Sequence, residues 1–168
     1  IILASESFAQ TTLTGSNNPV PEDEDRYAIC DTTNISQGNS GANQIWNFTT
    51  LTTQDSSNIN FVTTSSIPYA ARFPTSNIAS TNDNQNFSYA STSQNTFFTN
   101  GSGTSDLIVQ YTDAQLFMQY PFTFNTNFND NFGGTYTLSG NTAVRTGNTI
   151  VTGNAWGCLL YTSPSPRD

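Results

Sequence analysis

Aromatic and polar side chains alternate regularly between residues 120 and 132. A period of two predicts a β-strand with one face toward the core and the other toward water. The core-facing rings are Tyr120, Phe122, Phe124, Phe128 and Phe132, with Thr126 and Asp130 on the same face. The water-facing side carries Thr123, Asn125, Asn127, Asn129 and Asn131. Because so long a run rarely stays straight, we expect a bend or bulge near Thr126 or Asp130.

Shorter strand-like runs recur along the rest of the chain, and helical periodicity is nearly absent. The predicted strands cover 26–31, 44–49, 59–63, 87–90, 96–99, 107–111, 115–120, 135–138 and 149–156. Turn-forming clusters separate them at 38–41, 82–84, 100–103, 133–134 and 139–141. Strands at this spacing predict an all-β fold, specifically an antiparallel β-sandwich of the jelly-roll or Ig-like type.

The first nine residues resemble the end of a secretory signal peptide. An apolar start leads into Ser7-Phe8-Ala9, a small-x-small pattern that predicts cleavage after Ala9. Residues 1–9 are then a signal-peptide remnant, and the mature chain begins at Gln10. The alternative interpretation is a buried first strand.

Residues 158–168 match, codon for codon, one reading frame of a transposase-based sequencing adaptor. We therefore expect this tail not to be native, and residues 10–157 to form a single truncated domain. Leu159 and Leu160 are apolar and compatible with a strand, so a strand is still expected to run through them and to end at Pro164 and Pro166. The sheet is expected to be incomplete, with an unpaired edge.

Polarity in this chain comes from Asn, Thr, Ser and Gln, and charge is scarce. Lys and Arg together number 4, Asp and Glu 12 and His 0, for a net charge of −8. Nucleic acids and anionic membranes attract basic proteins, so both partners are disfavoured. No stretch approaches the roughly 20 apolar residues of a membrane helix, so membrane insertion is not expected. Cys30 has no disulfide partner within residues 10–157, and a bond to Cys158 would be an artefact.

Nucleophilic catalysis lacks its base, and the paired-carboxylate catalysis that the composition permits has no pair marked by spacing, so we expect no enzymatic activity. Ser40 lies in a turn-forming cluster, but the chain contains no His or Lys that could take its proton. Asp106, Asp113 and Asp130 are the candidates for a glycosidase pair. No spacing singles out two of them.

Metal-binding patterns are equally sparse, and no resident cofactor is expected. Zinc is disfavoured in a chain without His. The run 82–86 offers alternating oxygen ligands, but Phe87 and Ser93 stand where a calcium loop needs Gly and Glu. The acidic run 22–25 is expected to be a solvated loop, with a weak extracellular calcium site as the alternative.

Three aromatic residues are candidates for ligand binding: Trp46, Tyr69 and Trp156. An exposed ring on a β-fold can stack on a sugar, while neighbouring Asn and Thr side chains bind its hydroxyls. The alternative for Trp46 and Trp156 is a place in the core, because each lies in a strand of alternating apolar residues.

Several segments point to one kind of secreted protein. They are 30–36, 40–48 (SGANQIWNF), 120–124 with 128–132, and 144–147 with 155–157. Together they resemble the N-terminal β-rich region of secreted Bacteroidota proteins of the type IX secretion kind, which end in a type A sorting domain. The resemblance implies a cell-surface or released protein, and it carries no catalytic motif.

These observations predict a non-enzymatic extracellular or outer-surface module with a structural or adhesion role. The alternative is a carbohydrate-binding or ancillary module of a larger secreted hydrolase. Polysaccharide or cell-surface components are the expected partners.

Overall fold

Ten β-strands make up most of the described chain. The computed structural model describes residues 10–33, 35–36 and 38–160, so the predicted signal-peptide remnant lies outside it. The strands are β1 (Glu24–Cys30), β2 (Gly41–Asn47), β3 (Thr53–Val62), β4 (Ile78–Thr81), β5 (Phe87–Thr92), β6 (Thr96–Gly103), β7 (Leu107–Gln119), β8 (Asn127–Leu138), β9 (Asn141–Thr152) and β10 (Ala155–Leu160). The short 3-10 helices are η1 (Gly15–Asn17), η2 (Thr64–Ser66) and η3 (Ala70–Arg72).

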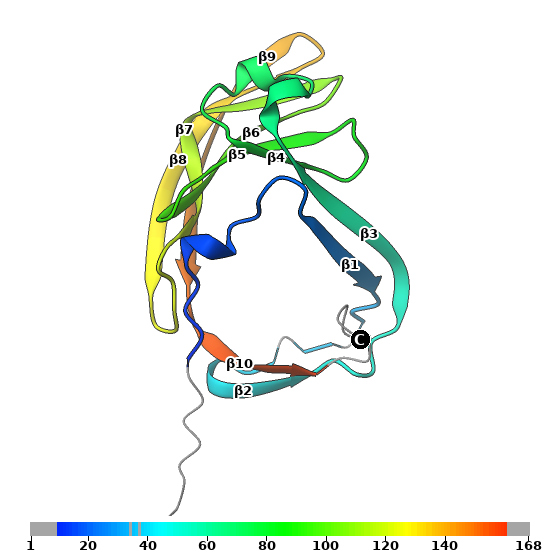
Figure 1. The fold of residues 1–168 in the computed structure, drawn as a ribbon, viewed down its shortest axis with the longest axis vertical. Coiled ribbons are helices and arrows are strands. Elements are labelled where there is room, and N and C mark those ends of the chain that lie inside the picture. Colours follow the sequence, from blue (N-terminus) through cyan, green and yellow to red (C-terminus); the bar gives the residue numbers. More distant parts are fainter. Residues whose placement is uncertain (1–9, 34, 37, 161–168) are drawn as a thin grey trace, which may run out of the picture.

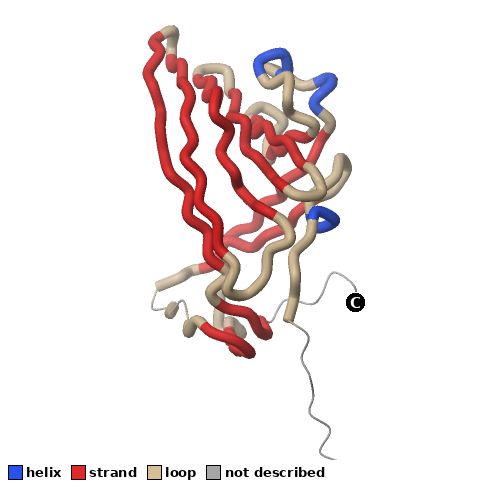
Figure 2. The backbone as a smooth tube through the Cα atoms, turned by 90° about the vertical axis from the view of Figure 1, so that its left-hand side faces the viewer, coloured by secondary structure: helices blue, strands red, loops and turns tan. Residues whose placement is uncertain are grey.

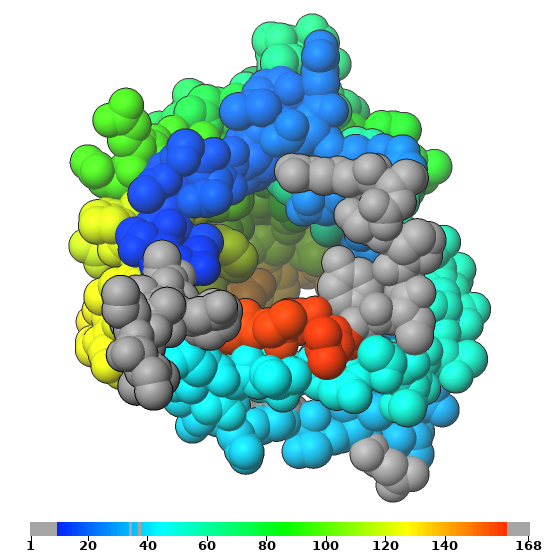
Figure 3. All heavy atoms as spheres, turned by 60° about the horizontal axis from the view of Figure 1, so that its bottom comes forward, coloured from blue at the N-terminus to red at the C-terminus, as the bar shows by residue number. Residues whose placement is uncertain are grey.

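Eight of these strands form one antiparallel sheet in the order β1-β3-β4-β5-β6-β7-β8-β9. The sheet curls strongly, so that β1 and β3 lie across the interior from β7 and β8 (Figure 1), and the long strands β7 to β9 run side by side (Figure 2). β2 and β10 pair in parallel as a separate two-stranded sheet. Viewed from the side of that pair, the molecule is hollowed at its centre (Figure 3). The all-β class is confirmed, whereas the jelly-roll or Ig-like sandwich stays a prediction.

Two predicted breaks between strands are wrong, because the chain passes through both as continuous strand. The cluster 100–103 lies in β6, and 133–134 lies in β8. Asn100 is a bulged residue, and its buried Nδ2 donates a hydrogen bond to Ser76 Oγ at 2.8 Å. Gly101 continues the strand with φ of 144°, a conformation that residues with a side chain rarely adopt.

The β8–β9 hairpin turns at Ser139 and Gly140, as the sequence predicts. Both residues have positive φ, 48° and 84°, and Leu138 pairs directly with Asn141. Two successive residues of positive φ are typical of a type I′ turn, whose twist matches that of the flanking strands. The ladder then runs without a register shift to the far end of both strands.

The alternating aromatic run is confirmed as a strand only from Asn127 onward, and it contains the expected bend. Phe128 is buried, whereas Asn127, Asn129 and Asn131 of the same strand are exposed. The bend falls at residues 123–126, where Thr126 Oγ1 donates to the carbonyl of Thr123 at 2.6 Å. β8 therefore begins only after this turn.

The hydrophobic core lies between the η2–η3 segment and the neighbouring strands β4 and β5. Its buried members are Phe73, Ala79, Phe87 and Tyr89. The ring of Tyr89 is fully buried and stacks on Phe73, with ring centroids 4.1 Å apart and planes 11° from parallel. Its hydroxyl donates to the carbonyl of Pro68. Burial raises the pKa of Tyr89 to about 12, because a phenolate would lose its hydration there.

The predicted strand through Leu159 and Leu160 is confirmed as the end of β10. These residues pair with Trp46 and Asn47 of β2. Pro164 and Pro166, predicted to end the strand, lie outside the described residues. Cys30 and Cys158 are both free thiols.

Candidate functional site

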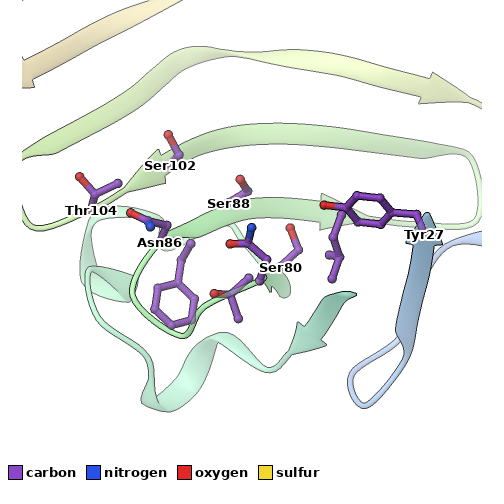
Figure 4. Close-up of a pocket in the computed structure, with 10 residues that line it drawn as sticks. Tyr27, Ser80, Asn86, Ser88, Ser102 and Thr104 are labelled. Atoms are coloured by element: carbon purple, nitrogen blue, oxygen red, sulfur yellow. The ribbon is translucent and has the colours of Figure 1, made fainter. Parts of the chain in front are cut away.

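A groove of about 350 Å³ lies over β4, β5 and β6, and we call it the polar groove (Figure 4). Its lining residues are Tyr27, Ile59, Ser80, Thr81, Asn82, Asn86, Phe87, Ser88, Ser102 and Thr104. Hydroxyls and amides dominate this lining, and none of its side chains carries a charge.

Strand register places three serines in one row across the polar groove. Ser80 of β4 pairs with Ser88 of β5, and Ser88 pairs with Ser102 of β6. Residues directly opposite one another in antiparallel strands point to the same face, so the three hydroxyls share a side (Figure 4). Phe87 and Tyr89 alternate with Ser88 and belong to the core cluster, and Phe87 also borders the polar groove.

The serine hydroxyls are available to a ligand. Within the part of the chain that the structure describes, Ser80, Ser88 and Ser102 make no side-chain hydrogen bond, and neither does the hydroxyl of Tyr27. Thr104 differs, because its Oγ1 accepts from the amide of Leu107 at 3.0 Å. The row therefore offers donors and acceptors that the fold itself does not use.

Tyr27 and Ile59 form the apolar side of the polar groove. They come from β1 and β3, where the pairs Asp25–Ile59 and Tyr27–Ser57 put both side chains on one face of the sheet. The Tyr27 ring is 42% exposed, and it stands at the Ser80 end of the row with its hydroxyl toward the serines (Figure 4). From the sequence, Trp46, Tyr69 or Trp156 is expected to provide an aromatic face beside polar side chains. In the polar groove, Tyr27 provides it.

The loop that joins β4 to β5 closes one end of the groove, and Asp83 organises it. Its Oδ1 accepts from the backbone amides of Gln85 and Asn86, each at 2.8 Å. Its Oδ2 accepts from the side-chain amide of Asn86. These donors, the Asn86 amide first, hold the pKa of Asp83 below its ordinary value, because they stabilise the carboxylate form.

Lowering the pH is expected to loosen this loop only in strong acid. Because the pKa of Asp83 is lower in the folded than in the unfolded chain, its carboxylate stabilises the fold fully at pH values above the unfolded pKa of about 3.9. This stabilisation is lost as the pH falls through the pKa of the folded state. The NMR shifts of the Gln85 and Asn86 amides should report that transition. Asp83→Asn is the control and should abolish it. An inflection at or above the ordinary aspartate value would contradict this assignment.

The three aromatic residues predicted as ligand contacts do not form one platform. Trp46 and Trp156 lie on the paired strands β2 and β10, but Gln44 pairs with Gly157, so alternation directs the two indoles to opposite faces. Trp46 Nε1 donates to the carbonyl of Asn39 at 3.3 Å. Tyr69 lies apart from both and packs against the core cluster.

Carboxylates and metal-binding groups do not gather in the described chain. Asp130 Oδ2 accepts the backbone amide of Leu116 at 2.7 Å, which explains its place in β8. In the acidic run 22–25, Glu24 is bound by Arg26 at 2.8 Å and by Asn58 Nδ2 at 2.6 Å. No group of three His, Cys, Asp or Glu side chains that could hold a metal ion occurs among these residues.

Sequence reasoning missed the serine row and had only a faint signal for it. Alternation of Ser88 with Phe87 and Tyr89 predicts that Ser88 faces away from the core. The register that aligns it with Ser80 and Ser102 depends on strand pairing, which a single sequence does not show.

Comparison with known proteins adds no relative: no family model, curated protein or solved structure matches the chain. Among the described residues, the helices are too short to cross a membrane.

Proposed function

We propose that this protein is a non-enzymatic extracellular β module that binds a neutral carbohydrate in the polar groove. The observation that carries the proposal is the row of three unused serine hydroxyls beside the exposed ring of Tyr27. Sugar hydroxyls need such donors and acceptors, and the apolar face of a sugar ring packs on an aromatic ring.

Charge favours a neutral glycan over an acidic one. The chain carries a net charge of −8, so its field repels polyanions. The lining of the groove has no Arg that could pair with a carboxylate or sulfate. A neutral polysaccharide meets neither obstacle.

The same lining supports binding without hydrolysis. Glycoside hydrolysis requires two carboxyl groups on either side of the scissile bond. The groove offers none, and the nearby Asp83 uses both its oxygens to hold the loop.

Sequence features support an extracellular setting for this proposal. The predicted signal-peptide remnant and the resemblance to secreted Bacteroidota proteins of the type IX secretion kind support an extracellular or outer-surface location. There, attachment to a polysaccharide would give the module an adhesion role. This proposal joins the structural or adhesion interpretation to the carbohydrate-binding alternative.

Replacing Tyr27 by Ala is expected to weaken glycan binding about tenfold, which corresponds to about 1.4 kcal/mol of lost contact. Binding is measured by titration calorimetry with glycans that a neutral glycan array has identified. Tyr27→Phe keeps the ring and should retain most of the affinity. Val144→Ala, at a side chain 77% exposed on β9, should change nothing.

Two results would contradict the proposal. One is an array on which no neutral glycan is bound by the wild-type protein. The other is a Tyr27→Ala variant that binds as tightly as wild type while its near-UV circular dichroism is unchanged.

A further inference from the structure

We infer that the polar groove holds an extended, β-linked glycan chain running across the strands, with one sugar ring over each of β4, β5 and β6. This inference rests on the proposed function and specifies the class of carbohydrate. It follows from the direction, the length and the ends of the serine row.

The direction of the row is perpendicular to the strands. Ser80, Ser88 and Ser102 are consecutive register partners on adjacent strands, so their hydroxyls repeat at the strand spacing of about 4.7–4.9 Å. An extended β-1,4-linked chain advances by a similar distance with each sugar. Each successive sugar can therefore lie over the serine of the next strand.

The repeat is unbroken within the groove. A register shift does occur between β5 and β6, but it falls between Tyr89 and Ala90, beyond the Ser88–Ser102 pair. Had the bulge come two residues earlier, Ser88 and Ser102 would not be partners. The groove thus lies on the regular part of these strands.

Apolar neighbours limit the row to three positions. Phe61 of β3 pairs with Ser80 at one end, and Val109 of β7 pairs with Ser102 at the other. Val109 is buried, 7% exposed, and offers no polar side-chain atom to a fourth sugar. The number of sugar rings that gain a hydroxyl contact is therefore three.

The two ends of the row are unlike. Tyr27 stands beyond Ser80, and Thr104 lies beyond Ser102 (Figure 4). The sugar over β4 thus gains the aromatic contact, whereas the sugar over β6 depends on Ser102. Removing the Ser102 hydroxyl should shorten the site by one sugar without affecting the contact between Tyr27 and the sugar over β4.

Calorimetric titration with defined oligosaccharides tests this arrangement. The probes are the β-1,4-linked series of glucose, xylose and mannose, each from one to six sugars. In the series that binds, affinity should rise from one to three sugars, about fivefold for each added ring that gains one hydrogen bond. It should then stay level from three to six.

The Ser102→Ala variant supplies the positional test. It should weaken trisaccharide binding about fivefold, leave disaccharide binding unchanged and move the plateau from three sugars to two. Ser105→Ala, at an exposed residue outside the groove lining, is the matched control and should behave as wild type.

The outcomes separate this inference from the proposed function. No binding to any glycan on a neutral array overturns both. Array binding together with no binding to the three β-1,4 series overturns the inference alone. So does a monosaccharide that binds as tightly as a trisaccharide, an affinity that keeps rising beyond three sugars, or an equal loss for di- and trisaccharide in Ser102→Ala.

Discussion

Tyr89→Ala is expected to lower the free energy of unfolding by about 3–5 kcal/mol, the range for truncating a large aromatic residue in a core. Tyr89 is the one fully buried large side chain among the described residues. Its removal would take away the stacked partner of Phe73 and leave a cavity between the η2–η3 segment and β5. The free energy of unfolding of a domain of this size is about 5–15 kcal/mol. If the value for this protein is about 5 kcal/mol, the substitution removes almost all of its stability.

Two further variants locate the source of that loss. Tyr89→Phe keeps the ring but removes the part-buried hydrogen bond to the carbonyl of Pro68, and it should cost about 0.5–1.5 kcal/mol. Tyr27→Ala makes the same truncation at an exposed site and should stay within about 0.5 kcal/mol of wild type. Urea unfolding followed by tryptophan fluorescence measures all three. Equal losses for Tyr89→Ala and Tyr27→Ala would show that the core lies elsewhere.

Gly101→Ala is expected to destabilise the fold by about 2–5 kcal/mol. The φ of 144° strains any residue with a Cβ, at a cost of roughly 1–2 kcal/mol. A Cβ there would also collide with the carbonyl of Val109 and approach the ring of Phe73 to 2.6 Å. Overpacking of this kind adds about 1–3 kcal/mol, because backbone cannot move aside as a flexible side chain would.

Gly140→Ala separates strain from collision. Gly140 also has positive φ, 84°, but an added Cβ would meet nothing within 4 Å. Its substitution should cost only the backbone strain, about 1 kcal/mol. The two variants are compared by their urea denaturation midpoints, provided that the dependence of the unfolding free energy on urea concentration is unchanged. If Gly101→Ala proved no worse than Gly140→Ala, the close packing of β6 on β7 would be refuted.

Local patterns in the sequence predict the features that depend on neighbouring residues, namely the inward and outward faces of a strand and the position of a tight turn. The aromatic alternation placed Phe128 inside and Asn129 outside, and the Ser139-Gly140 pair specified the last hairpin. Glycines were read wrongly where they serve close approach between strands. Gly134, buried in β8, lies against the carbonyl of Gln110, so no larger residue fits, yet the chain does not turn there.

Strand bounds were missed where tertiary contacts override local preference. The sequence does not predict β4, although its Ala79 is one of the most buried residues, because a run of four residues gives little signal. The segments 107–111 and 115–120 were predicted as two strands, but β7 runs through both with a register shift between Tyr111 and Asp113. A bulge keeps a strand continuous where sequence alone suggests a break.

The candidate site depended on information that one sequence lacks. Trp46 and Trp156 are candidates in the sequence because tryptophan is rare and its indole ring stacks on sugars. Serine is common in this chain, so nothing marked Ser88 or Ser102 until strand pairing aligned them. The absence of charge from the groove likewise became visible only after ten residues from five strands and their loops were brought together.

The pairing of β2 with β10 has a consequence for the order of folding. Each of the strands β3 to β8 pairs with the next strand along the chain, so the meander from β3 to β9 can assemble from short-range hairpins. β2 instead pairs with β10, which lies far along the chain, as the Gly41–Ala155 pair shows. This pair can form only after the intervening chain has folded. Contacts of such sequence separation form late and slowly, because closing a long loop costs entropy before any contact is gained. We therefore expect the curled sheet to form first and the parallel pair last.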